Sequence, residues 1–252
     1  MSTSATAINE ALYDQFWRSC PDFSRYNPGV LHRRDAIRRL LGTIKFRSVL
    51  DVGCGDGQLL IWLKRQLGDD VVFTGSDLSS ETVRENSLRH PYAQFHVMNL
   101  EREHLPGTYD VVLCTEVIEH LDEPAAALRN LAAMVAPGGH LILTCPTGKM
   151  YETERHFGHI AHPTPEEARG MIEGASLEVA SLENWGWPLY SGLKIVTNIR
   201  PKWAIRNFAN TRYGSAAKML SKALYWLNYL NVPSSRFGCQ LYILARKPES
   251  VR

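Results

Sequence analysis

Short apolar runs alternate with stretches of helical spacing over residues 46 to 146. This alternation predicts βαβ units and a parallel sheet, so the predicted fold class is α/β. The gaps between the strands are long enough for helices that close near Gly, Pro or a basic residue. Strands are expected at residues 48–52, 71–76, 93–98, 109–115 and 140–146, and helices at 58–67, 80–89 and 123–135.

The flanking segments continue the same pattern. Upstream, residues 7–17 and 31–42 predict two helices that precede the sheet and cover a binding cleft. Downstream, the sequence APGG predicts a turn, and the Thr164 hydroxyl is expected to cap a helix. The remaining expected elements are the turn at 136–139, a strand at 177–184 and a final strand that begins at Cys239.

A long insert separates the last two predicted strands. It comprises 53 residues, from Trp185 to Phe237, whereas a hairpin loop has about two to five. No Asp or Glu occurs from Asn184 through Pro248, a region that holds ten Lys and Arg residues. Because 28 basic and 26 acidic residues give the chain a net charge of +2, removing those ten leaves −8 for the rest. The insert, which also holds four of the six Trp residues, is therefore a basic and aromatic appendage on an acidic core.

Composition narrows the class of protein. Hydrophobic residues make up 44% and charged residues 21%, which excludes a disordered chain, a collagen-like repeat and a coiled coil. The first residues lack the basic start and apolar run of a secretory leader, and no apolar stretch reaches the roughly eighteen residues of a membrane-spanning helix. Five widely spaced cysteines without a CxxC pair favour reduced thiols and a cytoplasmic location.

The segment VLDVGCGDG places three glycines directly after a strand and at the start of a helix. Gly53, Gly55 and Gly57 allow a tight turn and a close approach of the backbone to a ligand, and the helix N-terminus offers free N–H groups. Asp77 ends the next strand, where nucleotide sites place the carboxylate that binds ribose hydroxyls. A dinucleotide site would have a third glycine where Gln58 stands, which argues against NAD.

The order of Asp51, the GxGxG turn and Asp77 resembles the class I S-adenosylmethionine-dependent methyltransferases over about residues 46 to 184. The resemblance implies a Rossmann-like, seven-stranded, mostly parallel sheet with helices on both faces and a helical insert before the last strand. It implies that Asp51, Gly53 and Gly55 line the methionine part, that Asp77 binds the ribose and that Asn99 lies near the adenine. The alternative is a bare turn, with Asp77 as a helix cap, although Ser79 can take that role. The implied cofactor-binding residues are Asp51, Gly53, Cys54, Gly55, Asp77, Leu78, Asn99, Leu100 and Glu116.

A second group of polar residues follows the fourth and fifth strands. In TEVIEH, Glu116, Glu119 and His120 would share one face if a helical turn begins there. Three histidines follow the fifth strand, and His162, next to a proline, is expected to be the most dispensable. Because both segments leave the carboxyl ends of parallel strands, we expect them to meet above the cofactor. The three histidines are His156, His159 and His162.

The EVIEH string resembles the ubiquinone-biosynthesis O-methyltransferases and the small-RNA 3′-terminal 2′-O-methyltransferases, in which Glu, Glu and His hold a divalent metal. That resemblance implies Mg²⁺ or Mn²⁺, which would lower the pKa of the acceptor hydroxyl. In the metal-free alternative Glu116 is a wall of the cofactor pocket, and His120 or His159 is a general base. The candidate catalytic residues are His120, His159 and Glu116, and the candidate metal ligands are Glu116, Glu119, His120 and His159.

The insert is expected to select the acceptor. Residues 215–230 predict an amphipathic helix whose leucine face packs on the insert's own core, with membrane contact as the alternative. The absence of acidic residues favours an anionic partner, and residues 185–190, WGWPLY, would offer aromatic surface at the cleft mouth. RNA is disfavoured because the chain has no added RNA-binding module. A small, sugar-containing or lipid-linked acceptor is therefore expected.

The sequence thus predicts a single-domain methyltransferase that methylates oxygen by in-line displacement, assisted by histidine or a metal. One alternative is a metal-dependent RNA 2′-O-methyltransferase, and another is a non-catalytic cofactor-binding partner protein. The expected location is cytoplasmic, with peripheral contact at the inner face of the membrane through the insert as a variant. The expected parts of the single domain, residues 1–252, are an N-terminal helical lid at 1–45, a cofactor-binding core at 46–184, the cap insert at 185–237 and the final strand at 238–247.

Overall fold

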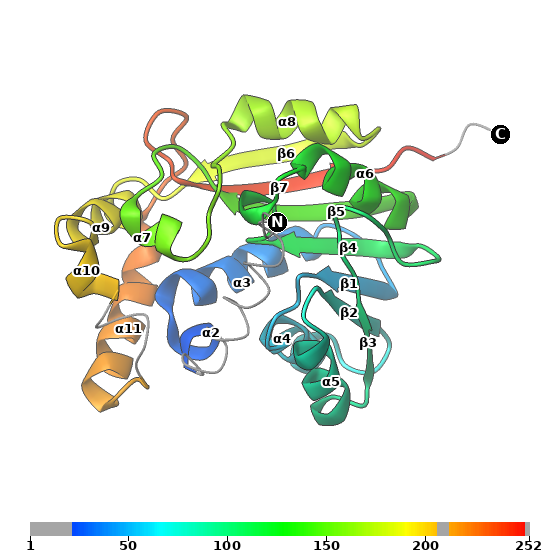
Figure 1. Ribbon diagram of the computed structural model, residues 1–252, viewed down its shortest axis with the longest axis horizontal. Helices are drawn as coiled ribbons and strands as arrows, with labels where there is room; N and C mark the ends of the chain where they lie inside the picture. Colours follow the sequence, from blue (N-terminus) through cyan, green and yellow to red (C-terminus); the bar gives the residue numbers. More distant parts are fainter. Residues whose placement is uncertain (1–21, 206–211, 250–252) are drawn as a thin grey trace, which may run out of the picture.

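A seven-stranded sheet forms the centre of the computed structural model, which describes residues 22–205 and 212–249 (Figure 1). The strand order is β3-β2-β1-β4-β5-β7-β6. Neighbours from β3 to β5 pair in parallel, and β7 pairs antiparallel with both β5 and β6. This confirms the predicted fold class. The strands are β1 Ser48–Val52, β2 Val72–Asp77, β3 Ala93–Val97, β4 Tyr109–Thr115, β5 Val135–Pro146, β6 Glu178–Trp185 and β7 Gln240–Arg246.

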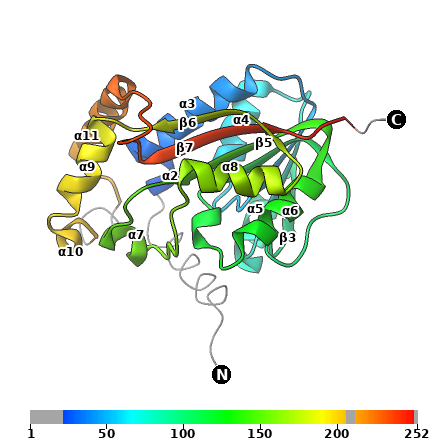
Figure 2. The same ribbon diagram turned by 90° about the horizontal axis from the view of Figure 1, so that it is seen from above.

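Helices cover both faces of the sheet because its strands are apolar on both sides. On one face, α6 (Pro124–Met134) and α8 (Pro165–Gly174) pack on the side chains of Leu50 and Val112. On the other face, α3 (Pro28–Leu41) and α4 (Gln58–Leu67) pack on strand residues one position away, such as Val49. Figure 2 shows α3 and α8 on opposite sides of the strands. The helix α5 (Ser80–Arg89) packs beside β2 and β3.

The fifth strand begins earlier than the sequence pattern predicts. Residues 136–139, expected to form a turn, lie inside β5, and α6 ends at Met134. The pairing of β4 with β5 shifts register here, and Gly138 has a φ of +77°. A Cβ at Gly139 would lie 2.9 Å from the Asp110 carbonyl oxygen, so glycine lets β5 approach β4 closely. The glycines therefore bend a continuous strand instead of ending it.

The insert between β6 and β7 is helical. It forms one end of the molecule, and the N-terminal helices α2 (Phe23–Tyr26) and α3 lie between it and α4 (Figures 1 and 2). The helix predicted at residues 7–17 lies outside the described residues, whereas the one predicted at 31–42 is the main part of α3. The insert contains α9 Leu189–Thr197, α10 Pro201–Ala204, α11 Ser215–Leu227 and the 3₁₀ turn η3 Asn228–Leu230, while α7 Glu152–His156 follows β5.

The orientation of α11 differs from the prediction. Its buried residue is Ser221, whereas the leucine face is solvent-exposed, with Leu220 at 54% and Leu230 at 65% exposure. Polar bonds to the N-terminal helices set this orientation, because the Ser221 hydroxyl donates to the Tyr26 carbonyl and the Tyr225 hydroxyl donates to Asp35. The expectation that the leucine face packs on the insert's own core is wrong. Among the residues that the structure describes, no helix is both long and apolar enough to cross a bilayer.

Candidate active site

The glycine turn joins β1 to α4 in a left-handed backbone conformation. Gly53, Gly55 and Gly57 have φ values of +72°, +49° and +71°. The Gly53 and Cys54 amides donate to the Ser76 carbonyl at 2.8 and 2.9 Å, so the turn is fixed to the end of β2. L-residues with side chains rarely adopt such φ values, which explains the three glycines in the sequence.

Asp77 ties the same turn to the next strand. One of its carboxylate oxygens accepts from the Gly55 amide at 2.9 Å, and the other accepts from the Ser79 amide at 3.0 Å. The hydroxyl of Ser79 accepts from the Thr82 amide and caps α5. Ser79 therefore performs the capping role, and Asp77 faces the cavity beside the turn.

A cavity of about 520 Å³ lies at the carboxyl edge of β1, β2 and β4. The N-terminal helices contribute Ser24 of α2 and Arg33 and Arg34 of α3 to its lining. His120 and His159 also line it, whereas Glu119 does not. Every residue predicted to bind the cofactor lines this cavity: Asp51, Gly53, Cys54, Gly55, Asp77, Leu78, Asn99, Leu100 and Glu116.

Buried acidic groups make one part of the cavity suited to a cation. Asp51 is 1% exposed, and its Oδ1 has no hydrogen-bond partner among the described residues. Burial, together with the negative charges of Asp77 and Asp56, raises the pKa of Asp51 to about 8. A ligand with positively charged groups would relieve this repulsion and offer a donor to the unbonded oxygen. The acidic side chains of the cavity therefore fit a ligand that carries ammonium and sulfonium groups, as S-adenosylmethionine does.

Glu116 lies apart from the other two residues of the EVIEH segment. It has a φ of +57°, and the short 3₁₀ turn η1 (Ile118–His120) starts after it, so the predicted common helical face is wrong. The Glu116 carboxylate forms an ion pair with Arg33 at 2.6 Å and accepts from Thr144 at 3.0 Å and Gln240 at 2.8 Å. Burial alone would raise the pKa of Glu116, but Arg33 and these donors outweigh it, so the pKa is lowered. Glu116 is thus a charged carboxylate with its partners already in place.

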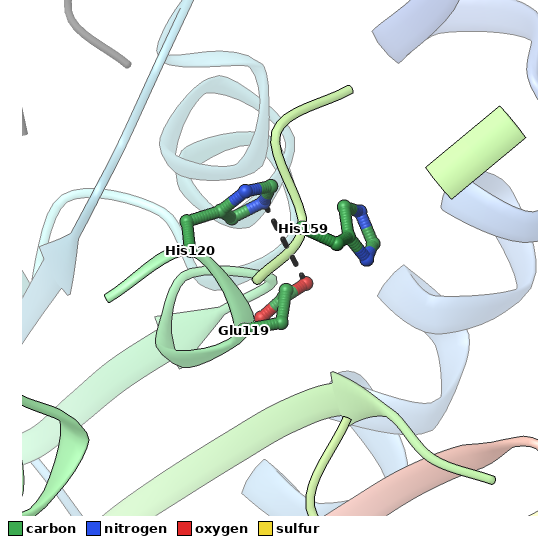
Figure 3. Close-up of side chains that lie close together, drawn as sticks. All are labelled: Glu119, His120 and His159. Atoms are coloured by element: carbon green, nitrogen blue, oxygen red, sulfur yellow. Dashed lines mark ion pairs between the residues drawn. The ribbon is translucent and has the colours of Figure 1, made fainter. Parts of the chain in front are cut away.

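Glu119, His120 and His159 form a separate cluster (Figure 3). One potential ligand atom from each lies within 4.8 Å of the others, and His120 Nε2 is 3.9 Å from Glu119 Oε1. The Ile160 amide donates to the Glu119 carbonyl at 2.8 Å, which holds the loop after α7 beside η1. The two segments therefore meet at the cavity wall.

Burial keeps this cluster neutral. It lowers the pKa of His120 to about 4 and, together with the neighbouring His120 and His162, lowers the pKa of His159 to about 2. Burial, and then the charge of Glu116, raises the pKa of Glu119 well above its usual range. Neither carboxylate oxygen of Glu119 has a hydrogen-bond partner in the described part of the chain. The imidazoles are therefore neutral at pH 7.

His162, which the sequence suggests is the most dispensable of the three histidines, contacts His159. Its Nε2 lies 2.9 Å from His159 Nδ1, so the two imidazoles share a hydrogen bond. The two ring centroids lie 5.2 Å apart. His156, on α7, is exposed and lines the cavity.

Two ion pairs near the cavity were missed by sequence reasoning. Arg33 pairs with Glu116, and Lys194 of α9 pairs with Glu154 of α7 at 2.7 Å. The pKa of Lys194 is raised because the adjacent Glu154 outweighs the effect of burial. The sequence signal for Arg33 was limited to the four arginines of the predicted helix at 31–42, since nothing local links residues 33 and 116.

The fold and the glycine turn are those of a class I methyltransferase. A family model described as a methyltransferase domain matches residues 25–190, which is more than half of the chain. The chain therefore belongs to this family of S-adenosylmethionine-dependent methyltransferases.

Known proteins of this kind resemble the chain in sequence and in structure. It is 35% identical over 136 residues to the ubiquinone biosynthesis O-methyltransferase of Bordetella avium, covering 51% of this chain and 55% of that protein. The chain thus spans about half the length of the curated relatives it matches. The N-methyltransferase NodS from Bradyrhizobium japonicum, solved with S-adenosylhomocysteine, has a TM-score of 0.59 at 17% identity, covering 94% and 99% of the two chains. The cyclase SpnF has a TM-score of 0.64 at 17% identity, covering 99% and 98%.

Proposed function

We propose that this chain transfers the methyl group of S-adenosylmethionine to a hydroxyl of a small acceptor. The observation that carries this proposal is the cavity in which the Gly53 to Gly55 turn, Asp77 and the unbonded Asp51 oxygen meet. S-adenosylmethionine supplies a methyl group on a sulfonium that is already reactive. The protein then needs to bind the cofactor and the acceptor, to align the acceptor hydroxyl with the methyl group, and to accept the proton of that hydroxyl. Relatives named as O-methyltransferases support oxygen as the atom methylated.

Two histidines are suited to accept the hydroxyl proton. His120 and His159 line the cavity, and burial keeps both neutral at pH 7. Their ring centroids are 4.6 Å apart, so both can contact one acceptor group. The hydrogen bond between His162 Nε2 and His159 Nδ1 fixes the ring of His159, and either His120 or His159 is a candidate base. In this proposal the charged Glu116 carboxylate lines the cofactor pocket and does not act as a proton donor.

A divalent metal is the second possibility, and the cluster of Glu119, His120 and His159 supports it. Carboxylate and imidazole ligands suit Mn²⁺ and, less well, Mg²⁺. The unbonded carboxylate oxygens of Glu119 would gain a partner there. Glu116 is a weaker candidate ligand than the sequence suggests, because Arg33, Thr144 and Gln240 already occupy its carboxylate. A bound metal would lower the pKa of an acceptor hydroxyl.

The acceptor is proposed to be small and, given the apolar insert beside the cavity, lipid-linked. The helices α2 and α3 line the cavity and contact α11, so the insert adjoins the acceptor side. RNA is the less favoured acceptor, because the exposed basic residues in the described part of the insert alternate along the chain with exposed apolar side chains. A cytoplasmic location fits the buried free cysteines of the described residues.

The test uses methyl-labelled S-adenosylmethionine and the lipid, small-molecule and RNA fractions of a bacterial extract. We expect label in the lipid or small-molecule fraction. The double variant His120→Ala, His159→Ala should lower the rate about a hundredfold or more, the usual contribution of a general base. Its affinity for S-adenosylhomocysteine should remain, and the exposed His96→Ala variant serves as the matched control.

Three outcomes separate the alternatives. If the double variant turns over at the wild-type rate, the histidines are not the bases. If chelation abolishes transfer and Mn²⁺ restores it, the metal mechanism holds, and label in RNA would then favour the RNA 2′-O-methyltransferase. If the protein binds S-adenosylhomocysteine tightly but labels no fraction, it is a non-catalytic cofactor-binding partner.

A further inference from the structure

The helix α11 carries an apolar face that points away from the body of the molecule. Residues seven positions apart lie on one face of a helix, and Ser221 and Asn228 are the buried pair. Met219 and Trp226, also seven apart, are 73% and 61% exposed. The exposed apolar side chains of α11 and η3 are those of Met219, Leu220, Trp226, Leu227 and Leu230.

Hydrogen bonds on the opposite side keep this apolar face outside. Tyr225 and Tyr229 both donate to Asp35 of α3, at 2.6 and 2.8 Å. The Asn228 amide donates to the Pro28 carbonyl at 3.2 Å. A rotation of α11 that buried its leucines would break all of these bonds. The exposure is therefore a property of how the helix is attached.

The apolar surface continues beyond α11. Leu230 leads to Val232, whose amide donates to the Trp187 carbonyl at 2.7 Å. The Trp187 ring lies 4.7 Å from that of Phe237, centroid to centroid. Val232, Trp187 and Phe237 are all exposed. Exposed apolar side chains thus follow one another from α11 to Trp187 and Phe237, and a monomer in water rarely leaves a large apolar patch uncovered.

The segment that carries this patch also carries basic residues. Lys218 and Lys222 lie on α11, and Arg212 and Arg236 precede and follow α11 and η3 in the chain; all four are exposed. Lys222 is the lysine on the open side of α11, because Lys218 Nζ lies 4.5 Å from the centroid of the Tyr26 ring of α2. No acidic residue occurs between residues 184 and 248, and Asp35, which contacts α11, lies on its attached side. Exposed apolar side chains in a segment that also exposes Lys and Arg match the interface of an anionic bilayer, where the apolar groups enter the acyl boundary and the cations meet phosphates.

We propose that the face of α11 and η3, with Trp187, Val232 and Phe237, docks on the surface of a bilayer that contains anionic lipid. A second copy of the chain is the other occupant to consider. A symmetric contact through this face would bring together two inserts that both carry Lys and Arg and no Asp or Glu, and like charges oppose that contact. Because α11 packs on the helices that line the cavity, docking would bring the cavity close to the bilayer. The docking itself does not depend on methyl transfer.

The test is flotation of the full chain with vesicles of phosphatidylcholine alone or mixed with phosphatidylglycerol. We expect wild type to bind the mixed vesicles at least about tenfold more tightly, as charge attraction adds to apolar burial. The variant Leu220→Glu, Trp226→Glu should weaken binding about tenfold or more. Lys222→Gln should weaken it about fivefold, which corresponds to about 1 kcal/mol per basic residue.

Matched controls are Leu88→Glu on α5, where Leu88 is exposed, and Lys45→Gln, at an exposed lysine outside the insert. Neither should change vesicle binding. All variants should bind S-adenosylhomocysteine like wild type, which separates this proposal from the catalytic one. Absence of wild-type binding to the mixed vesicles would overturn the proposal, as would equal losses in the controls. A lipid-free dimer that the Leu220→Glu, Trp226→Glu variant dissociates would assign the face to a second copy.

Discussion

At the residue scale, Gly53 and Gly68 show what the cofactor turn requires beyond backbone freedom. Both have a positive φ, with values of +72° and +74°. A Cβ at Gly53 would overlap the Cγ2 atom of Val117, whereas a Cβ at Gly68 would meet nothing within 4 Å. Gly53 therefore lets the cavity wall approach the turn, while Gly68 serves only the end of α4.

We predict that Gly53→Ala lowers the affinity for S-adenosylhomocysteine about tenfold or more, because Val117 must move within the cavity wall. Gly68→Ala should lose about 1 to 2 kcal/mol of unfolding free energy from backbone strain, with unchanged affinity. Calorimetric titration and denaturant unfolding measure the two quantities. Equal affinities in both variants would show that the contact with Val117 does not matter for binding.

At the scale of elements, the ion pair between Arg33 and Glu116 joins α3 to the end of β4. Both side chains are largely buried, at 17% and 26% exposure. Arg39 of the same helix forms a second ion pair with Glu183, with 2.9 Å between its guanidinium nitrogen and the carboxylate oxygen. Arg39, however, is 58% exposed. The contrast separates a buried tie at the cavity from a surface contact.

We predict that Arg33→Met lowers the free energy of unfolding by about 2 kcal/mol, because Glu116 then remains buried without its cation. Arg39→Met should cost no more than about 1 kcal/mol. Adding Glu116→Gln to Arg33→Met should recover part of the loss, which a double-mutant cycle by urea unfolding would measure. Strictly additive losses would contradict a direct coupling.

The elements themselves were largely predictable from the sequence. Apolar runs and glycine or proline boundaries gave the strands and the helices of the sheet to within a few residues, since those signals are local. The APGG segment was misassigned because glycines that bend a strand resemble glycines that end one. The predicted orientation of α11 about its own axis was wrong, because periodicity identifies an apolar face but not what covers it.

The part of the candidate site that binds the cofactor was predictable, because its residues stand at strand ends and in a short motif. The turn from Gly53 to Gly57 and Asp77 follow from strand ends and spacing. Arg33 was missed because its contact with Glu116 spans 83 positions, which no local pattern encodes. The bond between His162 and His159 depends on the path of a loop, and spacing does not give that path.

At the scale of the whole molecule, a buried histidine makes stability depend on pH. His32 is 6% exposed and stacks on Trp185 with ring centroids 4.0 Å apart. Burial lowers its pKa to about 4, from 6.5. Between these values the unfolded chain takes up a proton that the folded protein does not. The contribution of neutral His32 to the free energy of unfolding is therefore fully present above pH 6.5. It is lost as the pH falls toward 4.

We predict that His32→Phe, which keeps an aromatic ring against Trp185, removes this dependence. Between pH 7 and pH 4.5 the unfolding free energy of wild type should fall by about 2 to 3 kcal/mol more than that of the variant. Urea unfolding at the two pH values measures the difference. Parallel pH profiles would mean that His32 is protonated in the folded protein as readily as in the unfolded chain.

The most direct measurement is calorimetric titration of S-adenosylhomocysteine into the full chain, with Asp77→Asn and the exposed Asp70→Asn as the matched pair. We predict binding of one molecule per chain, weakened about tenfold to a hundredfold in Asp77→Asn, because a charged acceptor is lost from the cavity. Asp70→Asn should bind like wild type. No heat of binding with wild type, or equal affinities for all three proteins, would contradict a cofactor site at the glycine turn.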